Sequence, residues 1–119
     1  MSDQIISVAR VATDRPARYG KQLVSHLTRR LTGEWDADAA TGALTLGEEG
    51  DHAELAAQDG ALVMTIHAAA AALDRWEDVL GRHLVRFGAK DELVATWTRS
   101  DGTPGTTQRV DDPSHQPPT

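Results

Sequence analysis

The sequence predicts an α+β fold, a two-layer sandwich in which two helices cover one face of a mainly antiparallel sheet. Only two segments carry an apolar stripe at helical spacing, whereas the other ordered segments show the alternation or β-branched content of strands. Four strands follow one another between the helices with only short turns, and such connections pair strands antiparallel. Because each helix has a single apolar stripe, we expect both on the same face, in the order β-α-β-β-β-β-α-β.

The first two predicted elements are a strand and a helix. Residues Ile5 to Thr13 are rich in Ile and Val, which favour strands. Asp14 is the predicted N-cap of the helix, and Pro16 suits the first helical turn, where its missing N–H has no partner to lose. Gly33 is the expected stop. The apolar stripe between these signals consists of Tyr19, Leu23, Leu27 and Leu31.

Two hairpins are predicted next. The first joins Gly33 to Asp38 with Ala43 to Gly47. The second places the favoured two-residue turn Asp59-Gly60 between His52 to Gln58 and Ala61 to Ala68. This turn requires the numbers of paired residues to sum to 119, and the pairs then match apolar with apolar. These pairs are Ala57 with Leu62, Leu55 with Met64, and Ala53 with Ile66.

A second helix and a last strand complete the predicted fold. The helix covers Ala70 to Phe87 and ends at Gly88, and the strand covers Glu92 to Arg99. The helical stripe consists of Leu73, Trp76, Leu80, Leu84 and Phe87. Gly81 lies inside this helix, where it costs about 1 kcal/mol relative to Ala but allows a close approach.

The chain has the length of one domain, at 119 residues. We expect a frayed N-terminus over residues 1–4 and a single α+β domain over residues 5–99. Residues 100–119 are rich in Pro, Gly and Thr, and Val110 is their only aliphatic residue. Such a segment buries too little apolar surface to offset the entropy of ordering, so it is predicted to be a disordered tail whose deletion leaves the fold intact.

Composition excludes several classes of function. The absence of Cys rules out disulfides, thiolate metal sites and cysteine nucleophiles, and it favours a cytoplasmic location. No apolar run approaches the ~20 residues of a membrane span, so we expect a soluble chain with no membrane contact. The net charge is −6, and the stretch 31–74 contains no Lys or Arg. Such an acidic stretch repels polyphosphate, so no nucleic-acid partner is expected.

Three separated motifs resemble the DUF2218 family, a group of short bacterial proteins of unassigned function. They are VATDRPARY at residues 11–19, QLxSHL at residues 22–27 and HLxRFG at residues 83–88. The resemblance covers residues 8–99 and implies a compact α+β domain. Because a similar domain can be appended to siderophore-interacting flavoproteins, it also implies a link to iron or siderophore handling. Gly20 departs from the family, which usually has a larger apolar residue there, and it could loosen the first helix by roughly 1 kcal/mol.

The sequence contains no motif that predicts a catalytic residue or a cofactor. Ser25 and His26 are adjacent, but neighbours on a helix point about 100° apart, which prevents direct activation of the hydroxyl. Neither the glycine patterns of nucleotide-binding loops nor the HExxH pattern of zinc enzymes occurs. No catalytic residue, cofactor or metal ligand is therefore assigned.

His26 and His83 are the candidate binding residues, because each lies on or beside an otherwise apolar helical stripe. In one interpretation both are partly buried imidazoles whose partners are backbone carbonyls or neighbouring acids. In the other they face one ligand in a pocket between the helices, and Arg18, Arg29 or Arg86 neutralises that ligand.

The lack of catalytic spacing and the separation of charge favour a non-catalytic binding or accessory module. Its expected target is a partner protein or a small anionic ligand, with a link to iron or siderophore handling from the family resemblance. The alternative is a small enzyme, or a haem or iron carrier, that uses His26 and His83. An absorbance spectrum and metal analysis of the purified protein would separate the two classes.

The face of the sheet away from the helices carries two further expectations. Ala56, Val63 and Thr65 make this face less charged than an ordinary free surface, so it is a candidate homodimer interface. The hairpin register also places His52 opposite His67, beside Glu54. Two imidazoles at that separation could share a divalent ion. An open strand offers no groups to orient the ligands, however, so a solvated pair without a resident metal is expected.

Overall fold

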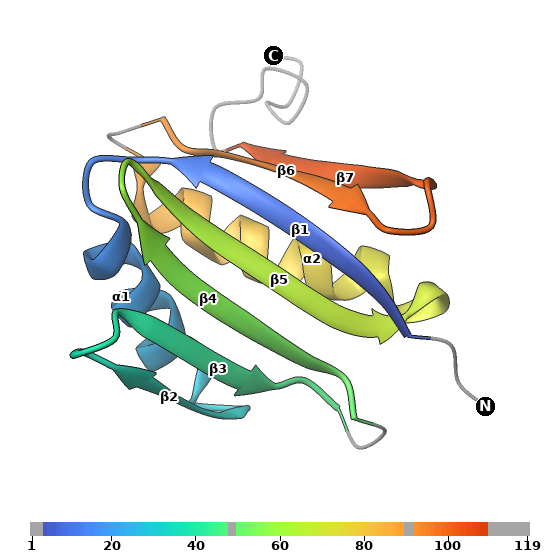
Figure 1. Cartoon of the computed structure of the whole chain (residues 1–119), viewed down its shortest axis with the longest axis horizontal. Coiled ribbons are helices and arrows are strands. Elements are labelled where there is room, and N and C mark those ends of the chain that lie inside the picture. Colours follow the sequence, from blue (N-terminus) through green and yellow to red (C-terminus); the bar gives the residue numbers. More distant parts are fainter. Residues whose placement is uncertain (1–3, 48–49, 90–91, 110–119) are drawn as a thin grey trace, which may run out of the picture.

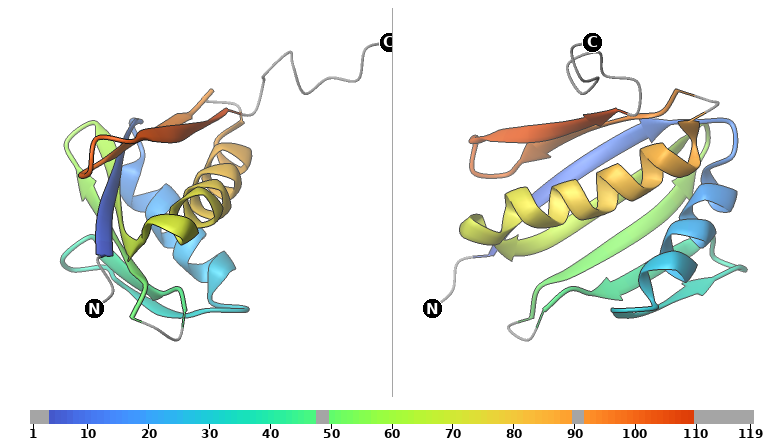
Figure 2. Two further views of the ribbon diagram at one scale, coloured as in Figure 1. Left: turned by 90° about the vertical axis from the view of Figure 1, so that its right-hand side faces the viewer. Right: turned by 180° about the vertical axis from the view of Figure 1, so that it is seen from behind.

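A seven-stranded antiparallel sheet and two helices make up the described part of the chain, residues 4–47, 50–89 and 92–109 of a computed structural model (Figure 1). The sheet order is β2-β3-β4-β5-β1-β6-β7. Both helices lie on one face of the sheet (Figure 2), which confirms the predicted α+β fold. The elements are β1 Gln4–Ala12, α1 Pro16–Leu27, β2 Thr32–Asp36, β3 Thr41–Thr45, β4 His52–Gln58, β5 Ala61–Ala69, α2 Ala70–Phe87, β6 Val94–Arg99 and β7 Pro104–Arg109.

The central hairpin β4–β5 has the predicted register. Leu55 pairs with Met64 and Ala53 with Ile66, and all four side chains are buried on the helix-covered face. Gly60 occupies the turn with φ of +78°, a conformation that glycine adopts without steric cost. One register thus fixes the whole core face of the two central strands and sends the intervening residues to the open face.

Helix α1 is shorter than predicted at both ends. Its N-cap is Arg15, and the Oγ1 of Thr13 accepts the Arg15 N–H, so the assignment of Asp14 as the cap is wrong. The helix ends at Leu27, and the following residues form a turn in which the N–H of Leu31 donates to the Leu27 carbonyl. Gly33 does not stop the helix but lies inside β2, where a Cβ would overlap the backbone of β3.

The predicted disordered tail is wrong over its first half. Residues 104–109 form β7, which pairs with β6 through Val94 with Arg109 and Thr96 with Thr107. This strand is stabilised by hydrogen bonds to buried groups rather than by apolar side chains, which composition alone does not reveal. Gln4, expected in the frayed terminus, belongs to β1 and pairs with Ala69 of β5. Residues 1–3 and 110–119 lie outside the described residues.

Gly20 has a structural reason for its small size. It is buried on α1, and a Cβ at this position would lie 2.7 Å from the ring of Trp35 on β2. The indole therefore occupies the space that a larger residue would need, so helix α1 and strand β2 can pack closely. The expected loss of helix propensity is offset by this contact.

Candidate functional site

Helices α1 and α2 enclose a groove of about 890 Å³ over the sheet, and His26 and His83 both line it. The two imidazole rings are in contact, with centroids 4.8 Å apart and planes tilted by 51°. The ring of Phe87 meets His26 edge to face at 5.2 Å. The structure thus brings together the two histidines that the sequence singled out, one from the last turn of α1 and one from the C-terminal third of α2.

Part of the wall of this groove is apolar. Leu27, Leu46 and Trp76 line it, although each is at least nine-tenths buried, and Leu31 and Val79 add partly buried aliphatic surface. These side chains come from α1, the segment after it, the residue that follows β3, and α2. Such a wall favours the apolar body of a small molecule over water.

Basic side chains surround the groove. Arg29 and Arg30 follow α1, and Arg75 lies on α2 with its guanidinium carbon 4.9 Å from the Trp76 ring centroid. All three residues are exposed, and no ion pair between described residues includes them. Asp51 contributes one carboxylate to the lining. With three guanidinium groups against one carboxylate, the groove attracts anions.

The pKa of His83 is lowered, first because burial penalises its charged form and then because His26, Arg86 and Arg82 repel a positive charge. His83 is therefore neutral at pH 7, with one ring nitrogen as a donor and the other as an acceptor. A neutral imidazole suits a hydrogen bond to a ligand or coordination of a metal.

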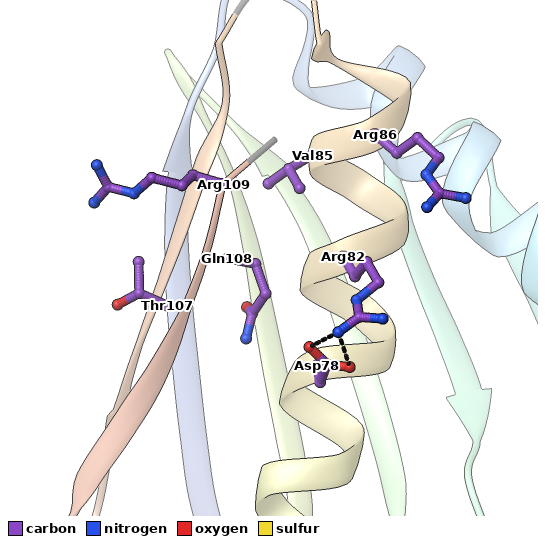
Figure 3. A pocket seen from close by; sticks show the side chains of 7 residues that line it. All are labelled: Asp78, Arg82, Val85, Arg86, Thr107, Gln108 and Arg109. Carbon is purple, nitrogen blue, oxygen red and sulfur yellow. Dashed lines mark hydrogen bonds and ion pairs between the residues drawn. The ribbon is translucent and has the colours of Figure 1, made fainter. Parts of the chain in front are cut away.

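The three arginines predicted to neutralise a ligand do not lie in one site. Arg29 lines the groove, whereas Arg18 is exposed on α1 and lies outside the groove lining. Arg86 lines a different cleft of about 370 Å³ between α2 and β7, together with Arg82 and Arg109 (Figure 3). In that cleft Arg82 pairs with Asp78, and the side chains of Arg86 and Arg109 extend to opposite sides. The guanidinium groups do not converge there, so this cleft is a weaker candidate than the groove.

One buried carboxylate escaped the sequence analysis. Glu77 is fully buried on α2, and its carboxylate accepts hydrogen bonds from Ser7 on β1, Arg99 on β6 and Thr106 on β7. Arg99 also pairs with Asp74. A sequence signal existed, because Glu77 stands four residues after Leu73 in the apolar stripe, where an isolated carboxylate requires a buried partner.

Hydrogen bonding decides the charge state of this carboxylate. Burial alone raises the pKa of Glu77, but the donors from Arg99, Ser7 and Thr106 together outweigh it and hold the pKa below its ordinary value. The same contact with Glu77 raises the pKa of Arg99. The cluster is thus a charged pair with satisfied hydrogen bonds, and it links α2 to three strands as a structural centre.

The residues predicted on the open face of the sheet lie on that face. Ala56 pairs with Val63 and Glu54 with Thr65, and each of these side chains is at least partly exposed. His52 and His67 are direct cross-strand partners on this same face. Pairing of two chains through this face stays a prediction.

Comparison with known proteins agrees with the sequence motifs. None of the described helices is long and apolar enough to cross a membrane. No curated protein and no solved structure matches the chain. The family model described as "Uncharacterized protein conserved in bacteria (DUF2218)" matches residues 8–98, which run from the middle of β1 through most of β6 and include both helices that form the groove. The chain therefore belongs to the DUF2218 family.

Proposed function

We propose that this protein is a non-catalytic binding module whose groove between α1 and α2 takes a small anionic ligand with an apolar body. The observation that carries the proposal is the contact between His26 and His83, 4.8 Å apart in a groove with apolar walls and an arginine rim. A partner protein could present the same chemistry through an acidic segment with an apolar side chain.

Each part of the groove has a matching part of such a ligand. Arg29 and Arg30 carry exposed guanidinium groups, which bind carboxylates, sulfonates or phosphates through paired hydrogen bonds. The wall formed by Leu46 and Trp76 accepts an aliphatic or aromatic body. The neutral ring of His83 supplies one hydrogen-bond donor and one acceptor to the groove.

A catalytic role lacks its minimal geometry at this site. Ser25 is exposed on α1 beside His26, and its carbonyl accepts the Thr28 hydroxyl. The neighbouring side chains diverge along the helix, so the imidazole does not activate the serine hydroxyl. Binding is therefore the function that this arrangement supports best.

The groove can be tested with anilinonaphthalene sulfonate, a fluorescent probe that has an aromatic body and one anionic group. We expect saturable binding to the folded protein, and we expect Arg29→Gln to weaken it by about tenfold, the value of one charge-assisted hydrogen bond. Arg18→Gln is the matched control, because Arg18 is also an exposed arginine of this region but lies outside the groove. Equal affinity of the two variants would refute the site.

The contact between two imidazoles also favours a second candidate, a haem or iron carrier or a small enzyme that uses His26 and His83. Hemin titration followed by absorbance tests it. A stoichiometric spectral shift that His83→Ala abolishes and His52→Ala retains would support a carrier. Iron or colour in freshly purified protein would also support it, whereas a colourless protein that leaves the hemin spectrum unchanged would favour the binding module.

The link to iron or siderophore handling is part of the proposal, because ferric siderophores combine anionic or polar metal-binding groups with a larger organic body. Quenching of tryptophan fluorescence is a suitable signal, since Trp76 lines the groove. Saturable quenching by a ferric siderophore that Arg29→Gln weakens would support the link. Quenching that does not saturate would oppose it.

A further inference from the structure

We propose that His52, Glu54 and His67 form a binding site for one divalent transition-metal ion on the open face of the sheet. This site is separate from the groove, because β4 and β5 present these three side chains away from the helices. Two imidazoles and one carboxylate suit zinc, nickel, cobalt or copper, whereas magnesium and calcium prefer sets of oxygen ligands.

The hairpin register brings the three ligand groups together. His52 and His67 are directly paired across the strands, and Glu54 follows His52 by two residues, so it lies on the same face. One ligand atom from each residue lies within 4.8 Å of the other two. Three ligands from two adjacent strands can therefore reach one ion without movement of the backbone.

One edge of this triangle already has the spacing of two ligands on one metal. The Nε2 atom of His67 lies 3.0 Å from the Oε1 atom of Glu54. Two ligands on a tetrahedral zinc ion with bonds of about 2.0 to 2.1 Å are roughly 3.3 Å apart. An ion that replaces the shared proton would need a shift of only a few tenths of an ångström at this edge.

The backbone orients His52 in the way that metal ligands require. Its Nδ1 atom lies 2.9 Å from the carbonyl oxygen of Gly50, and a carbonyl only accepts, so Nδ1 carries the hydrogen and donates it. Nε2 then carries the free lone pair. The same Gly50 carbonyl accepts a hydrogen bond from the Gln4 side chain at 3.1 Å, which anchors it to β1. The sequence analysis did not predict these two hydrogen bonds to the Gly50 carbonyl, which orient His52 for metal binding.

The geometry also shows what must move on binding. The two imidazole rings are stacked, with centroids 4.3 Å apart and an angle of 9° between their planes. Parallel rings do not point at a common centre, so one ring must rotate out of the stack. Glu54 has 62% of its side chain exposed, so solvent reaches the cluster. The remaining coordination position faces solvent and takes water or an external ligand.

The cluster of His52, Glu54 and His67 contributes little to the stability of the fold. An ion pair as exposed as His67 with Glu54 contributes about 1 kcal/mol at most. Metal binding gives all three side chains a common role.

The test uses the full chain, free of any affinity tag and treated with chelator, in calorimetric titrations with zinc chloride at pH 7.5. We expect one high-affinity site per chain with a micromolar dissociation constant. His67→Ala, His52→Ala and Glu54→Gln should each weaken it by at least about tenfold. Asp78→Asn is the control, because it removes an exposed carboxylate on α2, away from β4 and β5, and should leave zinc affinity unchanged.

A measurement on the unaltered protein guards against variants that fail to fold. Substoichiometric cobalt should broaden the NMR signals of residues around His52, Glu54 and His67 and leave those around His26 unaffected. Only millimolar zinc binding, equal affinity in His67→Ala, or broadening centred on the groove would each overturn the proposal. The first two outcomes would not bear on the groove, which is tested with Arg29→Gln and an organic probe, whereas broadening centred on the groove would support metal binding by His26 and His83.

Discussion

The two sides of helix α2 handle polar groups in opposite ways. Toward β1, β6 and β7, the fully buried carboxylate of Glu77 accepts hydrogen bonds from three residues on three strands. Toward α1, no hydrogen bond between described residues includes the ring nitrogens of His26 or His83, and the rings contact each other beside a groove of about 890 Å³. We call the side around Glu77 the closed side, because its polar groups are hydrogen-bonded within the protein. The side that carries His83 and faces the groove is the open side.

This difference separates stability from recognition within a single helix. Buried polar groups stabilise a fold only when their partners are complete, and every buried side-chain nitrogen and oxygen of the described residues has one. Half-buried groups whose partners are missing but reachable by solvent are instead available to a ligand. We therefore expect substitutions on the closed side to unfold the protein and those on the groove side to change binding.

Removal of β7 should have the largest effect on stability. A chain that ends at Thr103 loses the Thr106 donors to Glu77, and it loses Gln108, whose Oε1 accepts the Trp97 indole N–H at 2.7 Å. We expect a loss of about 5 kcal/mol or more, comparable with the whole stability of a domain. The reference is a chain that ends at Arg109, and urea unfolding compares the two. Equal midpoints would show that β7 adds nothing.

Glu77→Ala should have the next largest effect. The guanidinium of Arg99, whose side chain is only 9% exposed, would lose its buried partner and keep only the exposed Asp74. Removal of one partner from a buried ion pair costs about 3 to 5 kcal/mol. Asp78→Asn on the adjacent residue is the control, because Asp78 pairs with Arg82 in a solvent-exposed i,i+4 pair worth about 0.5 kcal/mol or less. If the two variants unfold at similar urea concentrations, the closed side does not carry the fold.

Acid should weaken the closed side at a lower pH than the groove. The folded pKa of Glu77 lies below its ordinary value, so the stabilisation is complete above the unfolded pKa and disappears as the pH falls through the folded pKa. Unfolding measured from pH 6 to pH 3 should therefore show a loss of stability that Glu77→Gln reduces. A Glu77→Gln variant with the same acid dependence as the natural chain would contradict this origin.

Gly81→Ala should be destabilising although Ala is the better helix former. A Cβ at Gly81 would overlap the side-chain amide of Gln108, so β7 would have to shift or Gln108 would lose its bond to Trp97. We expect a net loss of about 1 to 3 kcal/mol against the gain of about 1 kcal/mol in propensity. A double-mutant cycle with Gln108→Ala tests the overlap, because the two losses should not add. A stabilised Gly81→Ala variant would place Gln108 elsewhere.

The residues of the closed side also show which parts of the fold could not be predicted from the sequence. Periodicity predicted α2 to the residue, and the Asp59-Gly60 turn predicted the β4–β5 register, because both signals are local. Strand β7 was missed, since Thr106 and Gln108 are held by Glu77 and Trp97 across 29 and 11 residues of chain. A polar strand that is stabilised by distant buried partners has the composition of a tail.

The candidate site also contains residues that the sequence predicted and residues that it missed. His26 and His83 were predicted from their places on two apolar stripes, and the structure brings both into one groove. Arg18 and Arg86 were grouped with them on charge alone, and they lie outside that lining because the direction of a helical side chain depends on packing between helices. Arg75 was missed, although it comes directly before the buried Trp76.

The smallest effects on stability should come from the two groove histidines. His26→Gln and His83→Gln should each cost less than about 1 kcal/mol at pH 7.5, because both rings are half-buried and border the groove. Their pH dependence has a definite sign. Burial, His26 and the nearby arginines lower the folded pKa of His83, so protons bind the unfolded chain more readily as the pH falls below about 6.5.

The natural chain should therefore lose stability relative to His83→Gln between pH 7 and pH 5.5, and urea unfolding of both proteins at each pH measures the difference. An increase in relative stability over this range would mean that the folded protein favours the charged ring, as it would beside an acid rather than beside His26 and Arg86. A loss at pH 7.5 as large as that of Glu77→Ala would place His83 in the structural core. Either result would remove the distinction between the closed and open sides of α2.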